Sequence, residues 1–295
     1  MQIPKCDNGA VITRRTLLKS AGAMACAGPA AMAFRGARLK IGVTDWNLKQ
    51  TGNLEAVGLA KRLGFDGVQV SIGRKAVDGK MPLDNAELLA KYVSEAKSQQ
   101  IPIDGTCLDI LHVNGLKNDK LAQKWVSDGI RITHALGTEV MLLPFFGKQA
   151  LQTQEEKDYV GDVLRELAPA AEKARVILGL ENTISAADNM RIMDRARSKA
   201  VLVYYDVGNS TRNGFDVTRE IRELGRKRIC QFHFKDNPHY LGEGDIDFNG
   251  ILHAISEIDY NGFANFETDS PSHSVEGDMR RNLAYMRKLM VENKV

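Results

Sequence analysis

The chain has 295 residues, 43% hydrophobic and 26% charged, so it can bury a full core and has the composition of a soluble globular protein. Its formal charge of +3 comes from residues 1–33, which hold four basic side chains against one acidic one and leave the remainder neutral. The remainder has no basic stripe of the kind that nucleic-acid binding needs, so we expect no nucleic-acid partner and disfavour a phosphodiester substrate.

The first 33 residues have the order of segments that is typical of an export signal. Arg14-Arg15 lies in a charged segment, an apolar run rich in Ala and Gly follows, and Ala31-Met-Ala33 has the small residues of a cleavage site. This resembles a twin-arginine signal, so we expect a periplasmic protein whose mature domain, residues 34–295, does not insert into the membrane. A disordered basic tail is the alternative. Lipid anchoring at Cys26 is not expected, because the residues before it match that signal poorly.

Strand-like and helix-like segments alternate from residue 39 to the end. The expected strands cover residues 39–44, 67–71, 102–108, 139–143, 176–181, 200–206, 229–235 and 263–267. The expected helices lie between Asn53 and Gly64, over 85–98 and 119–136, on the apolar stripe 160–171, over 186–197 and 217–224, and on the stripe 279–290. This alternation predicts an α/β fold that closes into a (β/α)8 TIM barrel with its site at the C-terminal rim. An open doubly wound sheet is disfavoured because no Gly-rich phosphate loop follows the first strand.

Four consecutive strands in the C-terminal half end on a residue that can bind a metal ion. These residues are Glu181, Asp206, His233 and Glu267, and the spacings of 25, 27 and 34 residues are close to one strand-helix unit. Each follows or lies between apolar residues, and successive strand residues point to opposite faces, so we expect all four to face the barrel interior. The alternative is that they are unrelated residues at strand ends, each paired locally.

Three carboxylates and one imidazole, without a thiol, form a mostly hard donor set. Buried carboxylates resist ionising beside one another, and a divalent cation removes that cost. The set favours one six-coordinate ion, manganese ahead of magnesium or cobalt, while zinc at a catalytic site stays open. Cys107 and Cys230, the cysteines that remain after the signal, are expected to be buried free thiols.

These strand ends carry a family resemblance. Leu180-Glu181-Asn182, Asp206-Val-Gly-Asn209, His233-Phe-Lys235-Asp236 and Phe266-Glu267 make the chain resemble the sugar phosphate isomerase/epimerase family over residues 39–292. That family has xylose isomerase-like TIM barrels. The resemblance implies that the four residues hold the metal and that Glu181 and Glu267 are also the catalytic acid/base pair. It further implies proton abstraction α to a carbonyl, through an enediolate that the metal stabilises.

The substrate is expected to be a non-phosphorylated sugar or keto-sugar, because sugar phosphates are mainly cytoplasmic. Ketose epimerases that the chain resembles often have His where it has Asn209, and Arg where it has His239, so a simple ketohexose epimerase is not assumed. Candidate substrate-binding residues are Trp46, His112, Asn209, Lys235 and His239. Lys235 can instead pair with a ligand carboxylate, and Trp46 and His112 can be ordinary packed residues.

Three other functions compete with that of an epimerase or isomerase. A dehydratase or lyase acting on a keto-sugar or inosose would use the same site, and a non-catalytic exported sugar-binding protein would keep only the barrel. A DNA-repair enzyme like endonuclease IV is contradicted by the absence of further metal ligands and of a basic groove in the sequence. The expected partner is therefore a small carbohydrate, and a homo-oligomer stays open.

Overall fold

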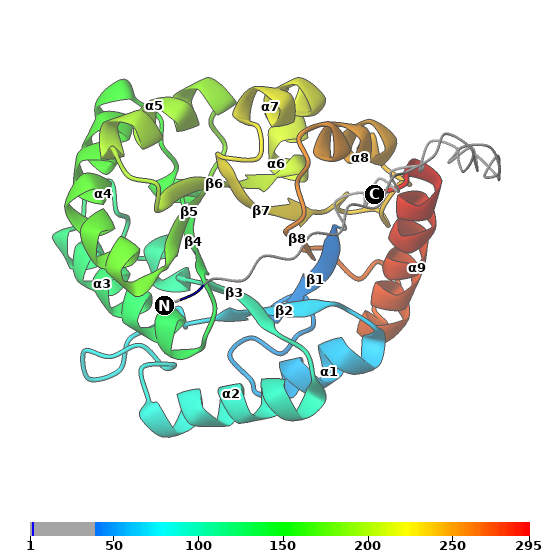
Figure 1. The fold of residues 1–295 in the computed structure, drawn as a ribbon, viewed down its shortest axis with the longest axis horizontal. Coiled ribbons are helices and arrows are strands. Elements are labelled where there is room, and N and C mark those ends of the chain that lie inside the picture. The colour runs from blue at the N-terminus through cyan, green and yellow to red at the C-terminus, as the bar shows by residue number, and fades with distance from the viewer. Residues whose placement is uncertain (1, 3–38) are drawn as a thin grey trace. The chain divides into compact units, whose positions relative to one another are not determined.

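The computed structural model describes residue 2 and residues 39–295, and the second range forms a closed barrel of eight parallel strands (Figure 1). The strands pair in sequence order and β8 closes on β1, which confirms the predicted TIM barrel and excludes the open sheet. The export signal and Cys26 lie outside the residues described by the structure, so they stay predictions. The strands are β1 (Lys40–Thr44), β2 (Gly67–Ser71), β3 (Ile103–Cys107), β4 (Val140–Pro144), β5 (Ile177–Glu181), β6 (Val201–Asp206), β7 (Ile229–Phe234) and β8 (Phe263–Phe266).

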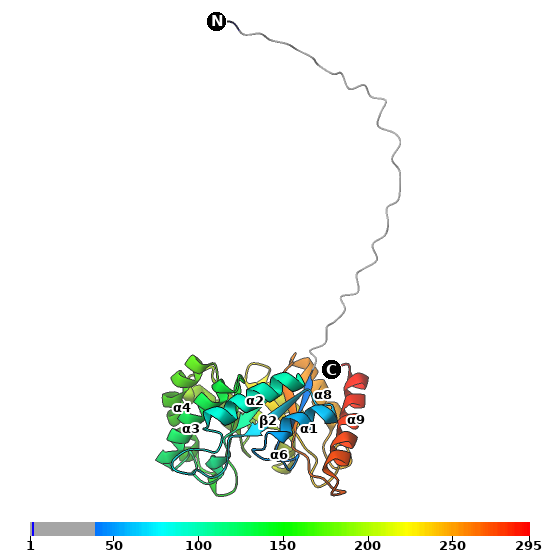
Figure 2. The same cartoon turned by 90° about the horizontal axis from the view of Figure 1, so that it is seen from below.

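Helices surround the barrel, as Figure 1 shows along its axis and Figure 2 from the side. Residues 39–295 hold the α-helices α1 (Glu55–Leu63), α2 (Ala86–Gln99), α3 (Lys120–Ala135), α4 (Gln154–Ala174), α5 (Ala186–Ala196), α6 (Val207–Arg212), α7 (Val217–Leu224), α8 (Phe248–Glu257) and α9 (Val275–Asn293). Two short 3₁₀ helices, η1 (Asp109–His112) and η2 (Gly147–Gln149), follow β3 and β4. None of these helices has the length and apolar character needed to cross a bilayer.

The expected strand boundaries agree with the structure to within one residue, and those of α1, α2, α3, α5 and α7 to within two. Helices α4 and α9 extend beyond the apolar stripes that predicted them, and no range was predicted for α6 or α8. Helix α6 was not predicted, because six residues are too few to show an apolar stripe. It begins directly after β6, and its N-cap is Asp206, whose Oδ1 accepts a hydrogen bond from the backbone N of Asn209 at 2.8 Å. The cysteines agree with expectation in being free, with Cys107 buried and Cys230 half-buried.

The lower part of the barrel interior is polar. Asn265 Nδ2 lies 3.0 Å from Asp104 Oδ1 and 2.9 Å from the Tyr204 hydroxyl, and all three side chains are buried. Gly42 and Gly67 make room for Asp104, since an added Cβ would lie 2.4 Å and 2.3 Å from its Oδ2. Most apolar strand residues belong to the main core with the helices, whereas Val140, Leu142 and Ile177 pack with Tyr204 in a smaller separate cluster. The interior is therefore a hydrogen-bonded platform beneath the C-terminal rim.

One buried carboxylate outside the barrel interior joins three elements. Glu220 on α7 is 4% exposed, and its Oε1 accepts a hydrogen bond from the backbone N of Ala186, the first residue of α5, at 2.8 Å. Its Oε2 accepts one from the hydroxyl of Tyr205 on β6, also at 2.8 Å. This contact fixes the two helices that flank β6, the strand that ends on Asp206.

Replacing Glu220 by Leu should lower the free energy of unfolding by about 2–4 kcal/mol, because the Ala186 N–H and the Tyr205 hydroxyl lose their partner. Urea denaturation followed by circular dichroism would measure it. The control is Glu223→Leu on the same helix, where the side chain is 47% exposed and a change within about 0.5 kcal/mol is expected. Equal effects of the two substitutions would contradict the assigned role of Glu220.

Candidate metal centre

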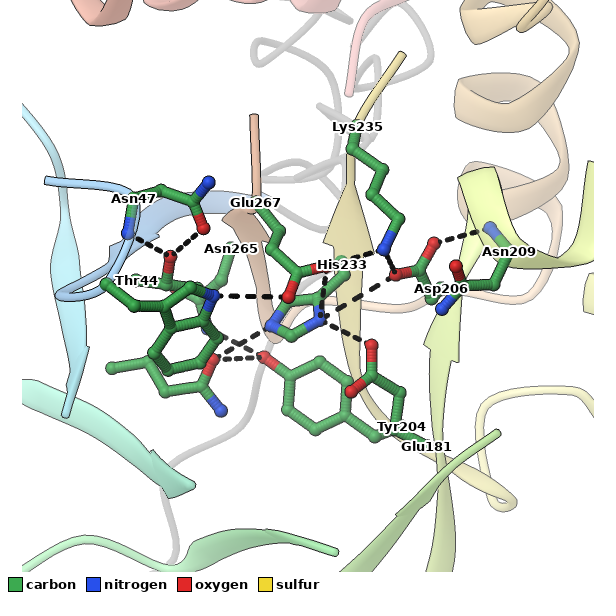
Figure 3. A network of polar contacts seen from close by, with 12 residues as sticks. Thr44, Asn47, Glu181, Tyr204, Asp206, Asn209, His233, Lys235, Asn265 and Glu267 are labelled. Atoms are coloured by element: carbon green, nitrogen blue, oxygen red, sulfur yellow. Dashed lines mark hydrogen bonds and ion pairs between the residues drawn. The ribbon is translucent and has the colours of Figure 1, made fainter. Parts of the chain in front are cut away.

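The ends of β5, β6, β7 and β8 bring Glu181, Asp206, His233 and Glu267 to one place at the C-terminal rim (Figure 3). Glu181 and Asp206 are the last residues of their strands, His233 is the penultimate residue of β7, and Glu267 follows β8 directly. One ligand atom from each residue lies within 4.8 Å of those of the other three. The four side chains that the sequence singled out thus form one cluster, named here the metal-centre cluster.

His233 directs one ring nitrogen at all three carboxylates. Its Nδ1 lies 2.8 Å from Glu181 Oε1, 3.7 Å from Glu267 Oε2 and 3.9 Å from Asp206 Oδ2. The side chain is fully buried. A neutral imidazole accepts through one nitrogen and donates through the other, so the chemistry of Nδ1 depends on the partner of Nε2.

That partner is Gln69, which the sequence reading missed. Gln69 Oε1 lies 2.9 Å from His233 Nε2 and 3.2 Å from the Tyr204 hydroxyl, while its amide nitrogen donates to the carbonyl of Thr106 at 3.4 Å. An amide oxygen only accepts, so Nε2 carries the proton and Nδ1 presents a lone pair to the cluster. Gln69 is a polar residue between two valines in β2, and the alternation that singled out the four cluster residues was also its signal.

Lys235 supplies the positive charge nearest to the cluster. Its Nζ lies 2.6 Å from Asp206 Oδ2 and 2.6 Å from Glu267 Oε2, and the residue is 8% exposed. Lys235 was expected either to contact the substrate or to pair with a carboxylate, and the structure shows the pairing. Trp46 does more than pack, since its Nε1 donates to Glu267 Oε1 at 3.2 Å, and its stacking on a sugar stays a prediction.

One lysine does not neutralise three buried carboxylates. Burial, followed by repulsion from Glu267, raises the pKa of Glu181 to about 8. Burial also raises the pKa of Asp206 to about 7, although Lys235 opposes this. Burial acts in the same direction on Glu267, but Lys235 and His233 outweigh it and lower the pKa of Glu267 to about 2. Without a cation, protons on Glu181 and Asp206 therefore offset the excess negative charge.

The cluster fits a divalent cation. Asp206 Oδ2 is buried, faces His233 Nδ1 at 3.9 Å, and has the ion pair with Lys235 as its charge partner, so it is an oxygen atom directed at the cluster that a cation can bind. The donor set of carboxylate oxygens with one imidazole suits a hard or borderline ion. Glu181, Asp206, His233 and Glu267 would hold it, and the identity of the ion stays a prediction.

A cavity of about 350 Å³ opens beside the cluster. Glu181 and Glu267 line it, whereas Asp206 and His233 do not. The predicted substrate-binding residues Trp46, His112, Asn209 and Lys235 also line it. Their position agrees with a contact to a ligand, and their roles stay predictions.

His239 is not among the residues around this cavity. It is exposed and lines a neighbouring hollow, because the chain turns back after β7 and the backbone N of His239 donates to the Asp236 carbonyl at 2.9 Å. The cavity instead includes Arg74 and Asp109, which the sequence reading missed. Asp109 lies two residues past β3, so an acidic residue near a strand end was again the available signal.

Comparisons with known proteins agree with this geometry. A family model described as "Xylose isomerase-like TIM barrel" matches residues 57–289. A 2-epi-5-epi-valiolone 7-phosphate 2-epimerase from Actinoplanes sp. is 26% identical over 208 residues, 69% of this chain and 74% of that protein. An L-ribulose-5-phosphate 3-epimerase from Salmonella typhi is 27% identical over 237 residues, which cover 71% of this chain and 79% of that protein. The solved structure of a 3-keto-D-glucoside 4-epimerase from E. coli covers 85% of this chain and 100% of its own at a TM-score of 0.69 and 19% identity, which supports the fold.

Removing the partner of His233 Nε2 should weaken metal binding. Gln69→Leu is expected to lower the affinity for Mn²⁺ by about 10–100-fold, because the imidazole then loses the group that fixes its tautomer and orientation. Titration against a chelating dye would measure it. Gln69→Glu, which restores an acceptor, should recover most of the affinity.

The control for Gln69→Leu is Gln231→Leu. Gln231 is also buried in the barrel interior, but its amide nitrogen donates to the carbonyl of Asp104 at 2.7 Å and not to His233. It should lose stability and keep its metal affinity. An equal loss of affinity in both variants would assign Gln69 a merely structural role.

Metal affinity should also fall as the solution becomes more acidic. The raised pKa values mean that Glu181 and Asp206 each carry a proton in the metal-free protein below about pH 7, and both protons must leave when the ion binds. Between about pH 8 and pH 6 the apparent affinity should drop by about tenfold per pH unit for each displaced proton. Asp206→Asn should bind more weakly with a shallower slope, and a flat profile would contradict the assigned protonation.

Proposed function

Because this chain belongs to the xylose isomerase-like TIM barrel family, we propose that it is a divalent-metal-dependent sugar epimerase or isomerase. The relatives named above are sugar epimerases, in agreement with an enzyme of the isomerase class. The single observation that carries the proposal is that, of the four cluster residues, only Glu181 and Glu267 line the cavity. Those two carboxylates are positioned to reach a substrate, while Asp206 and His233 are turned to the cluster.

The two glutamates have the properties of an acid/base pair. A divalent cation held by the cluster would act as a Lewis acid and make a proton α to a substrate carbonyl more acidic. Lys235 and Trp46 hold Glu267 ionised, as a base must be, whereas burial in the metal-free cluster raises the pKa of Glu181 and gives that carboxylate the stronger tendency to take up a proton. Environments that separate two pKa values in this way are typical of acid/base partners, and each proton transfer is worth about 10²–10⁴ in rate.

The direction from which each glutamate approaches decides the outcome of the reaction. Glu181 comes from β5 and Glu267 from β8, with β6 and β7 between them, so they reach the cavity from different parts of the rim. If Glu267 removes the proton and Glu181 returns one to the same carbon from the other side, the sugar is epimerised. Return of the proton to the neighbouring carbon isomerises it.

The proposed substrate is a sugar or keto-sugar without a phosphate group. The carboxylates of Asp109, Glu181 and Glu267 face the cavity, and Lys235 is already paired with two carboxylates. Burial lowers the pKa of His112, which favours its neutral form. Among the described residues, Arg74 is then the one cation in the cavity lining that is not already paired, against three carboxylates, so the lining does not favour a phosphate dianion. Asn209, His112 and Trp46 would contact the sugar hydroxyls. We further propose manganese as the ion, and export by the twin-arginine route.

Glu267→Gln should strongly slow proton exchange while leaving a folded protein. The metal-loaded protein would be incubated with a panel of keto-sugars in deuterated water, and deuterium at carbon measured by mass spectrometry. Loss of a base is expected to lower the exchange rate by about 10²–10⁴. Glu243→Gln, in an exposed loop beyond β7, is the matched control and should exchange at the unmodified rate.

Other outcomes of this experiment separate the competing functions. A product that has lost water or an alcohol, and so has a lower mass than the substrate, would favour a dehydratase or lyase. Sugar binding without any exchange would favour a non-catalytic binding protein. Exchange that survives in both Glu181→Gln and Glu267→Gln would overturn the acid/base assignment, provided that Mn²⁺ binding is measured for each variant.

A further inference from the structure

A second hollow of about 320 Å³ adjoins the cavity at the metal centre. Thr51 and Arg74 line both spaces, so the two meet at these residues. We call this space the side hollow; its walls also include Ile72, Pro82, Leu83 and Leu88. Binding sites for small ligands usually have volumes of about 300–1,000 Å³, so each space alone is near the lower limit and the two together fit a larger molecule.

Hydrogen bonds to one buried carboxylate hold the walls of the side hollow in place. Asp45 Oδ2 accepts from the backbone N of Gly52 at 2.9 Å and from that of Ser71 at 3.0 Å, which ties the loop after β1 to the end of β2. Gly73 lies against Pro82, and a Cβ at Gly73 would approach the proline ring to 2.4 Å. The hollow is therefore a fixed part of the rim, built from the segments that follow β1 and β2.

The side hollow differs in chemistry from the cavity beside it. No carboxylate and no aromatic ring line it, and its walls include the apolar side chains of Ile72, Leu83 and Leu88. Sugars are usually bound by acceptors for their hydroxyl groups and by aromatic rings that stack on the ring face. In the described part of the chain, the side hollow has no aromatic ring, and its side-chain acceptors are limited to the hydroxyls of Thr51 and Ser71; its other polar side chains, Arg74 and Lys75, only donate. It therefore suits an apolar group better than a second sugar ring.

Arg74 marks the border between the two spaces. It is exposed and has no ion-pair partner among residues 39–295. A guanidinium only donates hydrogen bonds, so it suits an acceptor oxygen at the point where a ligand passes from one space to the other. The oxygen that links a sugar to its substituent is such an acceptor.

We propose that the side hollow binds an apolar substituent of the sugar, so that the substrate is a glycoside with a non-sugar group and not a free monosaccharide. This inference rests on the proposed function, since it takes the sugar ring to lie beside Glu181 and Glu267. The substituent occupies the space between Ile72, Leu83 and Leu88, and Arg74 donates to the linking oxygen.

Three probes with the same reacting ring test the inference: 3-keto-D-glucose, its phenyl glycoside and a disaccharide that carries the 3-keto ring. Solvent deuterium uptake at carbon gives kcat/KM for each with the metal-loaded protein. The phenyl glycoside should exceed the free sugar by at least about tenfold, because even a single methylene in an apolar pocket is worth that much. Equal values for these two, or a preference for the disaccharide over the phenyl glycoside, would overturn the inference.

A substitution in the wall ties the preference to the side hollow. Leu88→Glu should lower the ratio of kcat/KM for the phenyl glycoside over the free sugar by about tenfold, since it places a charge among apolar side chains. Residue 88 is the third residue of α2 after the Asn85 cap, where Glu is favourable, so the helix should form. Leu121→Glu, at a 45% exposed leucine on α3, is the matched control and should keep the ratio.

A binding measurement separates failure of this inference from failure of the proposed function. If none of the probes takes up deuterium, the proposed reaction is wrong, and calorimetry with phenyl β-D-glucoside and with glucose still tests the hollow. Tighter binding of the glucoside that Leu88→Glu removes would support the side hollow. Equal binding of both ligands would refute it.

Discussion

The structure at the rim depends on one electrostatic constraint: three carboxylates and an imidazole lie within a few ångströms of one another, largely out of water. Like charges in such a place cannot all persist, so positive charge must be supplied. Lys235 supplies one unit by lying between Asp206 and Glu267. Protons or a divalent cation must balance the negative charge that remains. The cluster is therefore better explained as a site for an ion than as a set of structural ion pairs.

The barrel interior prepares the cluster for that ion. Tyr204, Asn265 and Asp104 form a hydrogen-bonded series beneath the rim, and Gln69 joins this series to His233. Every contact in the series restricts the rotation of the next side chain, so the orientation of the His233 imidazole toward the carboxylates is fixed before an ion binds. A core of branched aliphatic side chains would fill the same space without this control.

Sequence patterns predicted the barrel and the four residues of the metal-centre cluster for the same reason: each strand is a short apolar run whose polar end residue breaks the pattern. Gln69 follows that pattern too, but it was not predicted because a neutral amide is not a typical metal ligand. Helix α6 was not predicted because a helix of one to two turns shows no apolar periodicity. His239 was placed by its spacing from His233, and spacing fails where a loop reverses direction. The charge state of Glu181 could not be predicted from the sequence either, because it depends on burial and on distances between strands.

Asp206 serves two neighbours with one carboxylate. Oδ1 caps the first turn of α6, and Oδ2 faces the cluster. Asn209, whose backbone N makes the cap, also lines the cavity. An ion bound to Oδ2 and the helix capped by Oδ1 would therefore share one carboxylate group. The residue that binds the ion would also be the one that fixes the first turn of the cavity wall.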